Sequence, residues 1–163
     1  MFDGIEYFKR IASENKRCIE KGYCITTCSG PSGIEGVMEN FRRASRFVLV
    51  DDTTSGSVKP NRAGGFFNRR TFTVFIMSRH ERGSMESYER EMSECRELYL
   101  SLLSRVVRDA QHFRELDDVY IALDSIYYRE PGPYAANGAA GLYFMLPIDE
   151  PVDLRYNEEE WEV

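Results

Sequence analysis

The longest run of patterned hydrophobic positions, residues 84–110, predicts one amphipathic helix. Apolar residues recur there at steps of three and four, which places them on a single helical face, and the opposite face is rich in glutamate and arginine. Ser84 follows Gly83 and can cap the helix, and no proline or glycine interrupts the span. We expect the apolar stripe to pack against a sheet. It consists of Met85, Tyr88, Met92, Cys95, Tyr99, Leu102 and Val106.

The chain before this helix predicts two further helices and three strands. Residues 2–21 form an amphipathic pattern that Asp3 can cap and Gly22 can end, and residues 34–44 form a shorter helical pattern. Residues rich in β-formers predict strands, and the longest of these alternates through Phe72, Val74 and Ile76. The predicted strands are 23–28, 47–50 and 66–78.

Residues 53–65 are predicted to form the longest loop, because small residues, polar residues, glycine and proline dominate the segment. The loop joins two strands without a crossover helix, so these strands are expected to pair antiparallel. After the long helix, a polar connection at 111–118 leads to strands at 119–129 and 140–148, which form a second hairpin.

These elements predict an α+β fold with a mostly antiparallel sheet and two hairpins. Helices, including the long central helix 84–110, are expected to cover one face of the sheet. Residues 1–148 are expected to form a single domain, followed by an acidic C-terminal tail at 149–163.

Composition indicates where in the cell the protein is expected to be located. No apolar run approaches a membrane span, and the N-terminal residues lack the layout of a signal peptide, so a cytoplasmic protein without membrane contact is expected. Four cysteines would then remain reduced. Cys18, Cys24 and Cys28 lack the paired spacing of zinc ligands, and His80 and His112 lie far from them, so no metal site is expected.

The net charge of −6 is unevenly distributed along the chain. Residues 53–82 hold six basic residues and one acid, whereas residues 149–163 hold seven acids and one base. Two unrelated solvated faces would explain this layout, and so would a head-to-tail contact between copies or a basic segment facing nucleic acid. The basic residues are Lys59, Arg62, Arg69, Arg70, Arg79 and Arg82.

The segment 24–36 is the strongest candidate for chemistry. A strand, a glycine-rich turn, a helix and a strand ending in Asp51 and Asp52 follow one another, as in a dinucleotide-binding unit. The glycines follow GxxGxxG rather than GxGxxG, and Pro31 removes an amide donor, so a turn that starts a helix is the simpler interpretation. Cys28 before that helix lacks a patterned base. We therefore expect no catalytic residue and no cofactor.

The order of elements resembles a known family. Residues 47–52 (FVLVDD), a long polar loop, residues 70–78 (RTFTVFIMS), a helix and a hairpin ending in 141–146 (GLYFML) resemble the tail terminator, or tail completion, proteins of bacteriophages and prophages. The resemblance implies a structural protein rather than an enzyme, cytoplasmic during assembly and then part of the virion tail. Such proteins form a ring, commonly a hexamer, that ends the tail tube and docks the head connector.

This resemblance assigns roles to the charged residues. Lys59, Arg62, Arg69 and Arg70 are expected to contact a neighbouring copy or to face DNA in the ring, and Trp161 is expected to anchor the tail. The expected partners are other copies, tail-tube proteins and head-connector proteins, with non-specific proximity to DNA. Two alternatives stay open: a small-molecule or nucleotide-binding enzyme that uses the 29–36 loop, and a soluble adaptor that binds a partner through the central helix.

Overall fold

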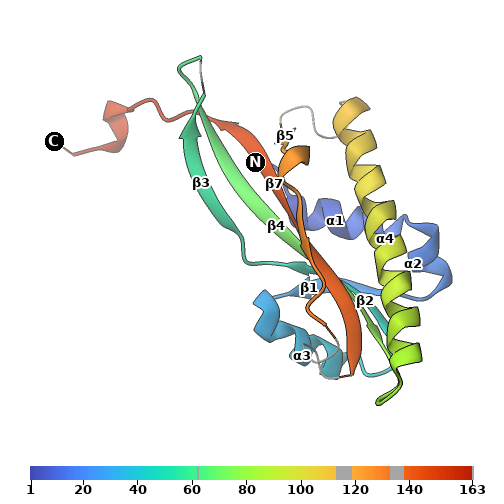
Figure 1. Cartoon of the computed structure of the whole chain (residues 1–163). Coiled ribbons are helices and arrows are strands. Elements are labelled where there is room, and N and C mark those ends of the chain that lie inside the picture. Colours follow the sequence, from blue (N-terminus) through green and yellow to red (C-terminus); the bar gives the residue numbers. More distant parts are fainter. Residues whose placement is uncertain (62, 113–118, 133–137, 163) are drawn as a thin grey trace.

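The computed structural model describes residues 1–61, 63–112, 119–132 and 138–162, and it has the predicted α+β class. A seven-stranded sheet within these residues has the order β1-β2-β4-β7-β5, with β3 paired to β4 and β6 paired to β7 (Figure 1). The helices are α1 (Gly4–Ser13), α2 (Lys16–Glu20), α3 (Gly30–Asn40) and α4 (Met85–His112), with 3₁₀ turns η1 (Leu123–Ser125) and η2 (Glu158–Glu160). The strands are β1 (Cys24–Cys28), β2 (Arg46–Asp51), β3 (Ser55–Pro60), β4 (Phe66–Arg79), β5 (Tyr120–Ile121), β6 (Tyr127–Arg129) and β7 (Ala139–Val152).

Two strands of 14 residues, β4 and β7, form the centre of the sheet. They pair antiparallel along their whole length, from Arg79 opposite Ala139 to Phe66 opposite Val152. The other edge of β4 is shared, because β2 pairs with its C-terminal half and β3 with its N-terminal half. The predicted antiparallel pairing of β2 with β4 is therefore confirmed.

The prediction of a loop over residues 53–65 is wrong for Ser55–Pro60, which form β3. This segment has a low intrinsic preference for strands. The N-terminal half of β4 would otherwise present unpaired backbone groups on this edge, and β3 pairs with them. Tertiary pairing therefore overrides local composition here.

One pair in the sheet is parallel: β1 runs beside β2, and α3 connects them. The helix begins at Gly30, four residues before the predicted start, and ends at Asn40 instead of residue 44. The strand–helix–strand outline of the 24–36 segment is thus present.

The helices lie on both faces of the sheet (Figure 1). Helices α1 and α4 cover one face, as predicted, where they pack on side chains such as Val48, Phe72 and Phe144. The prediction of a single covered face is wrong for α3, which packs on the opposite face, where Ile34 and Met38 contact a cluster that includes Phe47. Successive residues of β2 alternate between the two clusters, which accounts for its unbroken apolar run.

The predicted central helix is confirmed within two residues at its C-terminal end. The Ser87 N–H donates to Ser84 Oγ at 3.1 Å, so Ser84 caps α4 as expected. Met92, Cys95 and Leu102 of its apolar stripe are buried against the sheet. Burial raises the pKa of the Cys95 thiol to about 12, as expected for a small core residue.

The predicted N-terminal helix over residues 2–21 is two helices. Asn15 Oδ1 accepts hydrogen bonds from the N–H groups of Arg17 and Cys18, which starts α2 after α1 has ended. Asn15 Nδ2 also donates to Ser101 Oγ on α4 at 2.8 Å. Asparagine competes well for backbone groups, and this explains the break inside an otherwise continuous apolar pattern.

The C-terminal elements also differ from their predicted bounds. The strand predicted at 119–129 is interrupted by η1, which leaves the short strands β5 and β6. Strand β7 continues to Val152, so Asp149 and Glu150 are sheet residues rather than the start of a free tail. Most of the polar connection at 111–118, and most of the turn before β7, lie outside the described residues.

Candidate functional site

Two of the predicted interface residues converge on an acid of their own chain. Arg69 lies directly opposite Asp149 in the sheet, with Nε 2.6 Å from Oδ1 and Nη2 2.8 Å from Oδ2. Lys59 Nζ lies 2.8 Å from Asp149 Oδ2. The Arg69 hydrogen bond, with help from Lys59, lowers the pKa of the buried Asp149 carboxyl against the opposing effect of burial. These ion pairs connect β3, β4 and β7 where the three strands lie side by side.

Arg70 points to the other face, as strand alternation predicts. Its Nη2 donates to the backbone oxygen of Phe2 and lies 3.9 Å from Glu150 Oε2. The guanidinium also sits over the Phe72 ring, 5.0 Å from its centroid. Arg70 therefore fastens the start of the chain to the sheet. The structure does not gather Lys59, Arg69 and Arg70 into one patch, and Arg62 lies outside the described residues.

The glycine-rich turn binds carboxylates of its own chain. Gly30 has a φ of 68°, which glycine adopts freely, and its N–H donates to Asp51 Oδ1 at 2.9 Å. Ser29 Oγ donates to Asp52 Oδ2 at 2.8 Å. A phosphate at this helix N-terminus would meet two carboxylates in the place where amide donors are needed. The hydrogen bonds of this turn therefore connect the end of β1 and the start of α3 to the end of β2.

Cys28, at the end of β1, is buried beneath this turn. Burial raises the pKa of its thiol to about 12, and the carboxylates of Asp51 and Asp52 add to the increase. An activated nucleophile needs the opposite shift.

A hollow of about 760 Å³ lies on the face that α3 partly covers. Alternate residues of β4 and β7, among them Phe75, Met77 and Tyr143, form its apolar floor. Glu35 and Asp51 contribute acidic groups to its lining. The apolar residues at alternate positions of the two long strands are the sequence signal for this hollow, which the predicted elements did not include.

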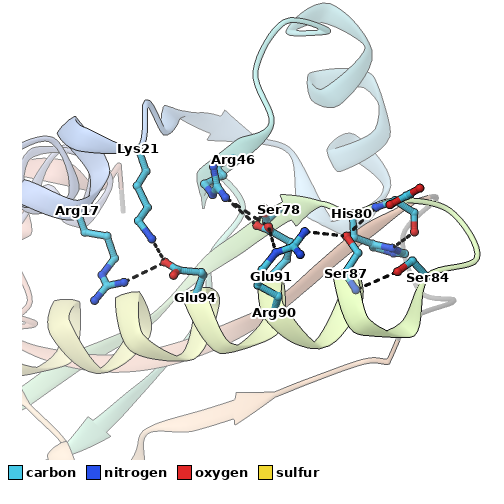
Figure 2. Close-up of polar contacts among 11 residues, drawn as sticks. Arg17, Lys21, Arg46, Ser78, His80, Ser84, Ser87, Arg90, Glu91 and Glu94 are labelled. Atoms are coloured by element: carbon cyan, nitrogen blue, oxygen red, sulfur yellow. Dashed lines mark hydrogen bonds and ion pairs between the residues drawn. The ribbon is translucent and has the colours of Figure 1, made fainter.

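A row of polar contacts connects α4 to its neighbours (Figure 2). Glu91 is buried, and its Oε2 accepts from Ser78 Oγ at 2.5 Å and lies 3.0 Å from Arg46 Nη2. One turn further on, Glu94 binds Lys21 and, at 2.9 Å, Arg17 Nη1. The pKa of Glu94 is lowered, with the hydrogen bond from Lys21 as the largest cause. Sequence patterning missed Glu91, because it lies at the border of the apolar stripe.

The segment after Val152 leaves the sheet and extends away from the body of the protein (Figure 1). Leu154, Tyr156 and Trp161 are exposed by 51%, 65% and 63%. The Tyr156 and Trp161 rings stack on each other, with centroids 6.1 Å apart. Within the described residues, Glu158, Glu159, Glu160 and Glu162 form no ion pair. Trp161 is thus an exposed ring on an acidic extension.

No protein-family model and no curated protein matches the sequence. In the part of the chain that the structure describes, no helix is both long enough and apolar enough to cross a membrane. Within the same residues, no group of three or more histidine, cysteine, aspartate or glutamate side chains is arranged to hold a metal ion.

Proposed function

We propose that this protein is a structural protein of a phage or prophage tail, which assembles into a ring that ends the tail tube and docks the head connector. The observation that carries the proposal is the extended segment 153–162. It exposes three large apolar side chains and an uncompensated run of acids, at a cost that contact with another chain would offset.

The distribution of buried surface favours assembly over the two alternatives. The apolar seam of α4, which includes Met92 and Tyr99, is buried within the chain, so it is not a free surface for an adaptor. The turn at residues 29–36 presents Asp51 and Asp52 where a nucleotide phosphate would bind, which disfavours a nucleotide enzyme. Proximity to DNA receives less support than assembly, because Lys59 and Arg69 already share an ion pair with Asp149.

Native mass tests the proposal. Light scattering after size exclusion should give a discrete oligomer for the full chain, and negative-stain electron microscopy of that fraction should show closed rings. A variant lacking residues 153–163 should elute as a monomer. The deletion must start at Asp153, because a cut at residue 149 would remove four residues of β7 and the partner of Arg69.

The matched control replaces residues 153–163 with a glycine–serine segment of the same length, which keeps the chain length and removes the side chains. It should behave as the deletion does. A full chain that remains monomeric at every protein and salt concentration would contradict the proposed function.

A further inference from the structure

The arginines that could bind an acidic segment differ from the predicted ones. Lys59, Arg69 and Arg70 already bind groups of their own chain. In the turn after α3, Arg42 and Arg43 are both exposed, and neither side chain has an ion pair or hydrogen bond among the described residues.

These two arginines lie beside an exposed ring. Phe41 is 45% exposed, and we call Phe41, Arg42 and Arg43 the arginine corner. Arg79 on β4 binds the backbone on both sides of this turn: its Nη2 donates to the Met38 oxygen at 2.7 Å, and its Nε donates to the Ala44 oxygen at 3.1 Å. The corner therefore presents two uncompensated cations and an aromatic ring on a fastened turn.

The segment 153–163 has the complementary chemistry. After Asn157 it carries four glutamates that form no ion pair with any described residue, and its Tyr156 and Trp161 rings are exposed. Guanidinium groups pair with carboxylates and also stack on tryptophan and tyrosine rings. Lys16, Arg82 and Arg129 also lack an acid partner among the residues that the structure describes, but none of them neighbours another such cation in the sequence.

The segment 153–163 and the arginine corner lie at opposite ends of the sheet. Arg79, which binds Met38 and Ala44 on either side of the corner, pairs with Ala139 at the start of β7. The segment 153–163 leaves from Val152 at the other end of that strand. A strand of 14 residues spans about 43 Å at about 3.3 Å per residue. Trp161 reaches at most about 32 Å from Val152 even when the chain is fully extended. The backbone of the segment ends short of the corner of its own chain, and the segment leads away from the body of the protein (Figure 1), so the acceptor is assigned to a second copy.

We infer that residues 153–163 of one copy bind the arginine corner of a second copy, head to tail. The inference rests on the proposed function, since it names the contact that would build the ring. A contact between two different surfaces of the same chain repeats from copy to copy and closes when the rotation allows. The hollow beside α3 is the less suitable acceptor, because Glu35 and Asp51 would repel the glutamates.

A peptide experiment tests the contact without requiring a ring. A labelled peptide of residues 153–163 is titrated by fluorescence anisotropy into the variant that lacks these residues. Saturable binding that weakens with salt is expected. The double substitution Arg42→Glu and Arg43→Glu should weaken binding at least tenfold, whereas Arg129→Glu, which alters another exposed unpaired arginine, should leave it unchanged.

Charge exchange separates a direct contact from a disturbed fold. A peptide with Glu158→Lys, Glu159→Lys and Glu160→Lys should bind the R42E/R43E protein better than the natural peptide does. The inference is overturned if the natural peptide does not bind, or if it binds R42E/R43E and the unaltered corner equally well.

Mixing two half-defective full chains tests the direction of the contact. The R42E/R43E protein retains its C-terminal segment, and the deletion variant retains its corner, so an equimolar mixture should form a 1:1 dimer that grows no further. If the R42E/R43E protein alone forms the same rings as the wild type, the proposed contact is wrong and the ring function stands. If the peptide binds but the wild-type chain forms no ring, the contact stands and the ring function is wrong.

Discussion

Single acids connect surfaces that are distant in sequence. Glu91 ties α4 to β2 and β4 through Arg46 and Ser78, and Asp149 ties β7 to β3 and β4 through Lys59 and Arg69. Both acids are buried and hydrogen-bonded, which is the condition under which a buried charge is tolerated. Their removal leaves a cation without its partner.

Replacement of Glu91 by alanine should destabilise the protein by about 2–3 kcal/mol, because Arg46 and the Ser78 hydroxyl lose their shared acceptor. Urea unfolding followed by circular dichroism measures the change. Glu89→Ala is the matched control, since Glu89 is exposed on the same helix, and it should change the free energy of unfolding by less than about 0.5 kcal/mol. Equal effects of the two substitutions would show that the Glu91 contacts contribute nothing.

Replacement of Asp149 by asparagine should lower the free energy of unfolding by about 1–2 kcal/mol at neutral pH. The pKa of Asp149 is lower in the folded state than in the unfolded state, so its contribution is complete above about pH 4 and is lost as the pH falls through the native value. The difference between wild type and D149N should therefore shrink below pH 4. Thermal unfolding across pH measures it.

Asp153→Asn is the control for this pH dependence. Asp153 also has a lowered pKa, of about 2, but its partner Arg155 is two residues away on the exposed segment. The substitution should leave unfolding unchanged at each pH. A gap between wild type and D149N that stays constant down to pH 2 would contradict the ionic role of Asp149.

At the scale of elements, caps and pairings decide where helices and strands end. The Asn15 side chain caps α2 and also reaches Ser101 on α4, so one residue both ends a continuous pattern and orients the short helix that follows. Neither contact is visible as a change in hydrophobic periodicity.

Asn15→Ala should destabilise the protein by about 1 kcal/mol, because two N–H groups at the start of α2 lose their acceptor. Asn15→Asp keeps that acceptor and loses only the donor to Ser101, so its effect should be smaller. Thermal unfolding of the two variants provides the comparison. A loss for N15D as large as that for N15A would assign the effect to Ser101 instead of the cap.

Sequence patterning recovered the elements whose burial is regular. The α4 stripe and the alternation of β4 predicted the right class, because one face of each is buried along most of its length. The antiparallel pairing of β2 with β4 followed from the lack of a crossover helix between them. Strand β3 was missed, since its residues are exposed and its conformation depends on the free edge of β4. The boundary between α1 and α2 was also missed, because the Asn15 cap that sets it does not change the hydrophobic pattern.

The candidate site was less predictable than the fold. The exposed Trp161 and the opposite-face placement of Arg69 and Arg70 follow from position and alternation. The partners of Lys59 and Arg69 do not, because Asp149 lies far away in the sequence, in the segment predicted to be an acidic tail. Charge counts along a chain identify which segments are basic, but only tertiary structure shows which charged side chains already have an ion-pair partner.

At the scale of the whole molecule, the long central strands separate two ends with different chemistry. The helices α1 and α4 make the body rigid, while the acidic segment and the arginine corner lie beyond opposite ends of β7 (Figure 1). In the proposed ring, a spacer of fixed length between the two surfaces would set a constant distance and rotation from one copy to the next. One closed assembly size would then be favoured over a range of sizes.

The central position of β7 also affects how the chain is made. Its partner β4 is synthesised long before it, and α4 lies between them in the sequence, so the middle of the sheet closes only when residues 139–152 have emerged from the ribosome. A product of premature termination would lack this strand and expose one edge of β4. In the proposed ring, such fragments would not supply a complete subunit, because the central pairing of the sheet would be missing.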